Sequence, residues 1–107
     1  YIVELNIVSH ASTTTPLGAG ATYTSTSQDA TGFKYIVGSC FADQDGTLYI
    51  EQSPDGTNWD VESSFSYTAN TKMGFSVEIV AKYVRVRFVN GATAQTVFRL
   101  YAWLRVL

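Results

Sequence analysis

Short runs of alternating apolar and polar residues, separated by turn sequences, fill residues 46–107, and this pattern constrains the fold more than any other feature of the sequence. One turn reads Ser-Pro-Asp-Gly at residues 53–56, which suits a type I turn with proline in second place. Another reads Asn90-Gly91, a pair that favours a tight hairpin turn. Residues 46–107 therefore predict a hairpin, a strand and a second hairpin.

The first predicted hairpin begins with strand 47–52, in which apolar and polar residues alternate. If residues 53–56 form the whole loop, Ile50 faces Trp59 across the hairpin. In that register every apolar pair lies on one face, so the pattern and the turn agree. The sequence thus predicts a four-residue loop and places Trp59 in the core.

The register of the second hairpin depends on the loop at Asn90-Gly91. A two-residue turn would bring Arg99 onto the core face. A loop one residue longer places Val84 opposite Phe98, and the apolar residues of the last strand then follow on the core face. We therefore predict an odd-length loop or a bulge. The last strand then has Leu100, Ala102 and Leu104 facing the core, and Arg99, Tyr101, Trp103 and Arg105 facing away from it.

The other segments complete an all-β pattern without a convincing helical period. Phe33–Ala42 and Gly74–Ala81 are expected to be core strands, Ala21–Ser27 a polar edge strand, and residues 63–72 a connection that is either unpaired or partly paired. About eight strands separated by regular turns predict an antiparallel β-sandwich of jelly-roll type. The chain has 107 residues, which suits one such domain, spanning residues 20–107.

Residues 1–19 are expected to form an arm and a linker outside the sandwich. The first eight residues alternate with apolar side chains on both faces, and a Thr/Gly-rich stretch follows them. Such a tethered strand can pair with its own sheet or with that of a neighbour. We expect it to contact a neighbouring subunit through Tyr1, Val3, Leu5 and Ile7.

The row Arg99, Tyr101, Trp103 and Arg105 is the other candidate contact surface. Aromatic residues and arginine are enriched at the centres of protein interfaces, so a protein partner is the first interpretation. Cover by another segment of the same chain is the second. A platform on which a sugar ring stacks is the third, because flat aromatic faces offer the apolar area that a pyranose requires.

Catalytic and metal-binding residues are scarce, so we predict no enzyme, cofactor or metal site. His10 is the only histidine, and it lies in the N-terminal stretch rather than on a rigid element. Cys40 is the only cysteine and lies in an apolar run typical of a buried strand. A calcium site would need the acids near residues 43–46 and 53–60, but the two turns lie at opposite ends of strand 47–52.

Charge is low and unevenly distributed. The net charge is −2, which excludes a basic footprint for nucleic acid, and no apolar run is long enough for a membrane helix. Every acid except Glu78 lies in residues 1–62, and every lysine and arginine except Lys34 lies in residues 63–107. Copies of the chain would attract head to tail if these halves formed separate surfaces; interleaved sheets would cancel the asymmetry.

The order and spacing of two segments resemble a known family. The run Phe41–Asp60 (FADQDGTLYIEQSPDGTNWD), the run Lys82–Gly91 (KYVRVRFVNG) and the tail to Leu107 resemble a β-sandwich domain of tailed-bacteriophage virion proteins. The Tyr-Val-Arg strand is also similar to discoidin-like, galactose-binding sandwiches. The first resemblance implies a non-enzymatic capsid decoration, head-fibre or tail component located in the virion, with other virion proteins as partners and a homo-oligomer, such as a trimer, as the assembled form. A carbohydrate-binding module and a subunit of an extracellular filament are the alternatives.

Overall fold

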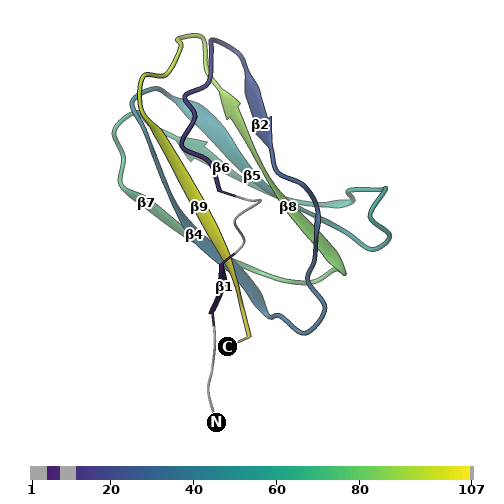
Figure 1. The fold of residues 1–107 in the computed structure, drawn as a ribbon. Helices are drawn as coiled ribbons and strands as arrows, with labels where there is room; N and C mark the ends of the chain where they lie inside the picture. Colours follow the sequence, from purple (N-terminus) through teal and green to yellow (C-terminus); the bar gives the residue numbers. More distant parts are fainter. Residues whose placement is uncertain (1–4, 8–11, 107) are drawn as a thin grey trace.

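The computed structural model describes residues 5–7 and 12–106, which form two antiparallel sheets packed face to face (Figure 1). The first, sheet A, has the order β1-β9-β4-β7. Its strands are β1 (Leu5–Ile7), β4 (Tyr35–Ala42), β7 (Met73–Glu78) and β9 (Phe98–Arg105).

The second, sheet B, has the order β2-β8-β5-β6, and β3 pairs with β8 as well. Its strands are β2 (Thr22–Thr24), β3 (Gln28–Asp29), β5 (Gly46–Ser53), β6 (Val61–Tyr67) and β8 (Tyr83–Asn90). The described residues form no helix, so the predicted all-β antiparallel sandwich is confirmed. From β4 onward the chain changes sheet at every connection except β5–β6.

The core lies between the sheets and is built from alternate residues of the four central strands. Strands β4 and β9 contribute the core residues of sheet A, and strands β5 and β8 contribute those of sheet B. The ring of Phe88 packs against the rings of Tyr67 and Phe98. This burial removes apolar surface from water and supplies most of the stability of such a domain. The fully covered apolar side chains include Ile36, Leu48, Ile50, Val84, Val86, Phe88, Phe98, Leu100 and Leu104.

The predicted register of the first hairpin is wrong, although its first strand, 47–52, and the core face of that strand are right. Ile50 pairs with Ser63 rather than with Trp59, and β6 begins only at Val61. The reason lies in the turn, where the Asp55 carboxylate accepts hydrogen bonds from the backbone N–H groups of Thr57 and Asn58. These donors stabilise a longer loop and do not enter the ladder. Part of the expected connection 63–72 is consequently strand.

The second predicted hairpin does not exist, because β8 and β9 belong to different sheets. Strand β8 already has β5 along one edge and β2 and β3 along the other. The chain after Asn90 crosses the sandwich instead, and its last part is held by Asp43, whose carboxylate accepts from the N–H groups of Thr96 and Val97. The predicted odd-length hairpin loop is therefore wrong, but the facing of β9 that it was meant to explain is correct.

The contribution of the Asp55 hydrogen bonds to stability can be tested in the loop after β5. The hydrogen bonds from Asn58 and Thr57 hold the pKa of the Asp55 carboxyl far below its usual range. Because this folded pKa lies below that of the unfolded chain, the bonds stabilise the fold above about pH 4, and that stability is lost as the pH falls through the folded value. Asp55→Asn should therefore lower the melting temperature at neutral pH. The difference in melting temperature between this variant and wild type should become smaller as the pH drops below about 4.

Thermal melts from neutral to acidic pH measure this difference. Asp60→Asn is the control, because Asp60 lies in the same loop and takes no part in these bonds. A difference between wild type and Asp55→Asn that stays constant over the whole pH range would contradict the assigned role of the carboxylate.

Candidate interaction surface

The four predicted residues of β9 lie in a row on the outer face of sheet A, the face turned away from the core. Leu100, Ala102 and Leu104 between them are buried. Arg99 and Tyr101 are exposed, whereas Trp103 and Arg105 are half-buried. Period-two alternation in a strand with one buried face produces this arrangement. We call this row the β9 row (Arg99, Tyr101, Trp103, Arg105).

Aromatic rings hold the side chains of the β9 row in place. The Tyr101 and Trp103 rings stack with centroids 6.5 Å apart. The guanidinium of Arg99 lies 4.8 Å from the ring centre of Phe41, its cross-strand partner on β4, and that of Arg105 lies 5.0 Å from the ring centre of Tyr35. Cation–π contact fixes these arginines without neutralising them. Phe41 and Tyr35 were not predicted to belong to this surface, although the alternation along residues 33–42 places both on the outer face.

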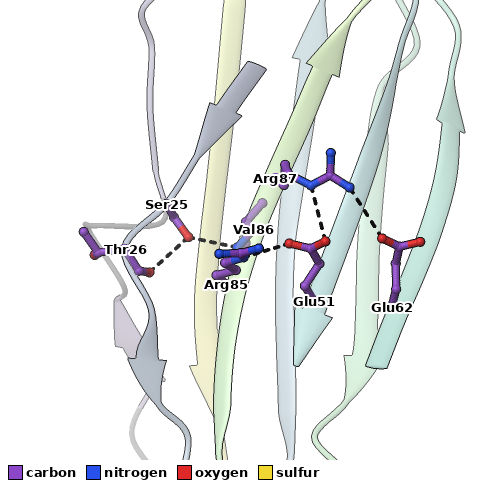
Figure 2. Close-up of polar contacts among 7 residues, drawn as sticks. All are labelled: Ser25, Thr26, Glu51, Glu62, Arg85, Val86 and Arg87. Atoms are coloured by element: carbon purple, nitrogen blue, oxygen red, sulfur yellow. Dashed lines mark hydrogen bonds and ion pairs between the residues drawn. The ribbon is translucent and has the colours of Figure 1, made fainter. Parts of the chain in front are cut away.

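Sheet B neutralises its own charges on its outer face. The Glu51 carboxylate accepts from Arg85 at 2.7 Å and from Arg87 at 3.3 Å, and Arg87 also reaches Glu62 at 3.4 Å (Figure 2). The Glu51 side chain is only 7% exposed. Acids from the first half of the chain and bases from the second half thus meet on this face. Interleaving is therefore the correct interpretation of the charge asymmetry for sheet B.

Trp59 belongs to this outer face and not to the core, which corrects the sequence prediction. It is half-buried, and the Arg85 guanidinium lies 4.2 Å from its ring centre. Tyr49 covers Arg87 in the same way at 4.1 Å. Two rings and two arginines thereby shield Glu51 from water. This layer pairs charges within the sheet and covers Glu51.

Sheet A retains its positive charge. All ion pairs among the described residues lie on sheet B, so Lys72, Arg99 and Arg105 have no carboxylate within salt-bridge distance in the described part of the chain. Glu78, at the end of β7, is the one acid in the sequences of β4, β7 and β9. Arg105 Nε is buried without a hydrogen-bond partner among the same residues. Among the described residues, the outer face of sheet A is therefore cationic, and its arginines have no carboxylate partner.

An open hollow of about 540 Å³ adjoins the β9 row. It lies over the middle of sheet A, where β4 is flanked by β9 and β7. Ser39 and Gly74 are paired across β4 and β7, and their small size leaves the space open. The remaining lining residues are Cys40, Phe41, Lys72, Met73, Arg99 and Tyr101.

The polar groups considered for catalysis or metal binding are otherwise engaged or lie outside the described residues. His10 lies outside them. Burial raises the pKa of the Cys40 thiol to about 12, which removes its nucleophilic form at neutral pH. The Asp43 carboxylate accepts hydrogen bonds from Thr96 and Val97 in the β8–β9 connection, and the Asp55 carboxylate accepts hydrogen bonds within its own turn. Within residues 5–7 and 12–106, no three acidic, histidine or cysteine side chains group as metal ligands.

The N-terminal candidates lie partly beyond the described residues. Tyr1 and Val3 are outside them, and Leu5–Ile7 pairs as β1 with β9 of its own chain. Thr13 also bridges to Leu100, with its N–H 2.8 Å from the Leu100 carbonyl oxygen. Where it is described, the segment expected to be a separate arm therefore extends sheet A. Contact of Tyr1, Val3, Leu5 and Ile7 with a neighbour stays a prediction.

Comparison with known proteins places the chain in a family. The family model described as the N-terminal domain of the uncharacterised protein YqxG matches residues 2–105. The chain belongs to the YqxG N-terminal domain family. The match includes most of the N-terminal segment that the sequence analysis set apart. In the described part of the chain there is no apolar helix of the length that a bilayer crossing requires.

Two relatives from Bacillus subtilis (strain 168) cover much of the chain. The uncharacterized protein YqxG is 36% identical over 90 residues, which are 79% of this chain and 30% of YqxG. The phage-like element PBSX protein XepA is 30% identical over 104 residues, 94% of this chain and 37% of XepA. The chain thus spans about a third of the length of these relatives.

A solved structure that is similar to this chain has the same fold. The crystal structure of the PBSX exported protein XepA superimposes with a TM-score of 0.83 at 28% identity, over 95% of this chain and 37% of that one. The similarity expected to a phage-related β-sandwich is therefore confirmed at the level of a phage-like element.

Proposed function

We propose that this chain is a non-enzymatic structural domain of a phage particle, a capsid decoration or head-fibre subunit that packs against copies of itself and other virion proteins. The observation that carries the proposal is the outer face of sheet A, whose arginines have no carboxylate partner among the described residues. There, the two arginines and the stacked rings of the β9 row face outward. Interface centres combine aromatic rings with arginine in this way. The relationship to a protein of a phage-like element supports a role in a particle.

The contrast between the two sheets makes the proposal specific. Sheet B buries its carboxylate under its own arginines, whereas the arginines of sheet A stack on rings and lack carboxylates among the described residues. A partner that supplies carboxylates and apolar surface would complete this face.

Native mass spectrometry of the protein at high micromolar concentration tests the proposal. Wild type should be an oligomer, and the double variant Arg99→Glu/Arg105→Glu should shift to monomer while keeping its strand content. Lys82→Glu is the matched control, because Lys82 is exposed on a turn next to sheet B. A monomeric wild type, or a double variant that assembles like wild type, would contradict the proposal. Particle imaging separates a closed decoration or fibre oligomer from an open extracellular filament.

Carbohydrate binding is the second candidate function, and the hollow beside Tyr101 favours it. Tyr101 is 38% exposed and is one of two large hydrophobic side chains that remain exposed among the described residues. Its ring borders a space of the size that small ligands occupy.

A further inference from the structure

The hollow on sheet A exists because two adjacent strands carry small residues at the same level. Ser39 on β4 pairs with Gly74 on β7 and with Tyr101 on β9. Larger side chains stand around this level, with Arg99 and Phe41 on one side. A β-carbon added to Gly74 would meet nothing closer than the Gly38 carbonyl oxygen at 3.8 Å. The floor is therefore open to a ligand rather than filled by the protein.

The lining offers positive charge without a compensating acid. Arg99 and Lys72 both line the hollow, and none of its lining residues is acidic. Stacking on Phe41 at 4.8 Å restricts the Arg99 guanidinium, so it is already positioned for an anion. Charged groups held in this way give strong, directional contacts to carboxylates.

The wall of the hollow offers a flat apolar surface next to this charge. The Tyr101 ring is exposed at the rim and is backed by Trp103, 6.5 Å away between ring centres. Met73 and Phe41 contribute further apolar atoms. A ligand that fits has a ring with one apolar face and carries a negative group at its edge. Its size is bounded by the volume of about 540 Å³.

We infer that the hollow bordered by Tyr101, Arg99 and Lys72 binds an anionic sugar, a pyranose that carries a carboxylate. The ring lies against Tyr101 over the floor of Ser39 and Gly74, and the carboxylate faces Arg99 and Lys72. This inference goes beyond packing between subunits, because it depends on the shape and charge of the hollow and not on the far end of the β9 row. It defines the ligand class for the second candidate function.

Titration calorimetry with a galacturonic acid oligomer and with its methyl ester tests the inference, because the two probes differ in charge. Wild type should bind the acid roughly tenfold more tightly than the ester, and added salt should weaken binding of the acid. Gly74→Val should weaken binding by roughly tenfold or more, since it fills the hollow from the floor while favouring the strand. Ser76→Val is the matched control on the same face of β7, outside the lining.

Several results would show that the hollow is not a site for an anionic sugar. Equal affinity for acid and ester, no binding of either, or unchanged binding by Gly74→Val would overturn the inference. Tighter binding of an oligoglutamate than of the sugar would also overturn it and assign the hollow to an acidic protein segment. Native mass measurements on the same Gly74→Val protein keep the two proposals apart: loss of sugar binding with normal assembly supports the site regardless of how the packing proposal fares.

Discussion

Replacing Gly38 with alanine is expected to destabilise the domain by about 3 kcal/mol. Gly38 lies in the middle of β4, between β9 and β7. A β-carbon there would lie 2.0 Å from the Tyr101 carbonyl oxygen and 2.6 Å from Cζ of Phe75. The oxygen belongs to the neighbouring strand and cannot move far without disturbing the β4–β9 ladder. Because the ring of Phe75 faces the core, it cannot rotate into solvent either.

Urea unfolding of Gly38→Ala and Gly74→Ala measures this effect with a built-in control. Both glycines lie in strands of sheet A, but the space above Gly74 is open. Alanine at 74 should be neutral or stabilise the fold by up to about 1 kcal/mol, because glycine loses more backbone entropy on folding. The melting temperature of Gly38→Ala should fall by roughly 15 °C. Similar losses in the two variants would show that close packing at Gly38 is not the cause.

Glu51→Ala is expected to cost about 2 kcal/mol of unfolding free energy, the second large effect. Glu51 is the anion beneath the rings and arginines on sheet B. Its removal leaves Arg85 and Arg87 side by side without the carboxylate that separates their charges. Their side chains are each 27% exposed and regain part of their hydration, so the loss stays below that of a fully buried pair.

Glu62→Ala is the control for this ion-pair layer. Glu62 contacts the same Arg87, but its side chain is 48% exposed and the distance is 3.4 Å. An exposed pair of this kind contributes less than about 1 kcal/mol. In about 1 M salt the small Glu62 effect should disappear, whereas most of the Glu51 effect should remain. Equal losses, or a Glu51 effect abolished by salt, would contradict a shielded role for Glu51.

The facing of β9 could be predicted from sequence although its pairing could not. Alternation along Phe98–Arg105 is a property of the strand itself, so Leu100 faces the core and Tyr101 faces outward whatever lies beside them. The partner of β9 depends on which strand edges remain free once the sheets form. A two-sheet sandwich gives β8 and β9 different neighbours, and a hairpin inferred from Asn90-Gly91 alone does not capture this.

At the turn of residues 53–56, the sequence predicts the end of one strand but not the start of the next. Its residue types correctly indicate where β5 ends. They do not reveal that Asp55 continues the turn by accepting the N–H groups of Thr57 and Asn58, which delays β6 and moves Trp59 to the outer face. Side-chain bonding in a loop changes the register without changing the pattern.

The hollow between β4, β7 and β9 could not be predicted from the sequence either, although the facing of its residues could. Sequence alternation places Ser39, Gly74 and Tyr101 on outward faces, but only pairing sets these three residues at one level. The contrast between sheet A arginines that stack on rings and sheet B arginines that pair with Glu51 also arises only in the folded chain.

By itself, therefore, the sequence determined the all-β class, most strand positions and the core-facing residues of β4, β5, β8 and β9, because these follow from local periodicity. Only the tertiary structure decided which strands pair, which charges meet and where a ligand-sized space remains, because these depend on contacts between residues far apart in the chain.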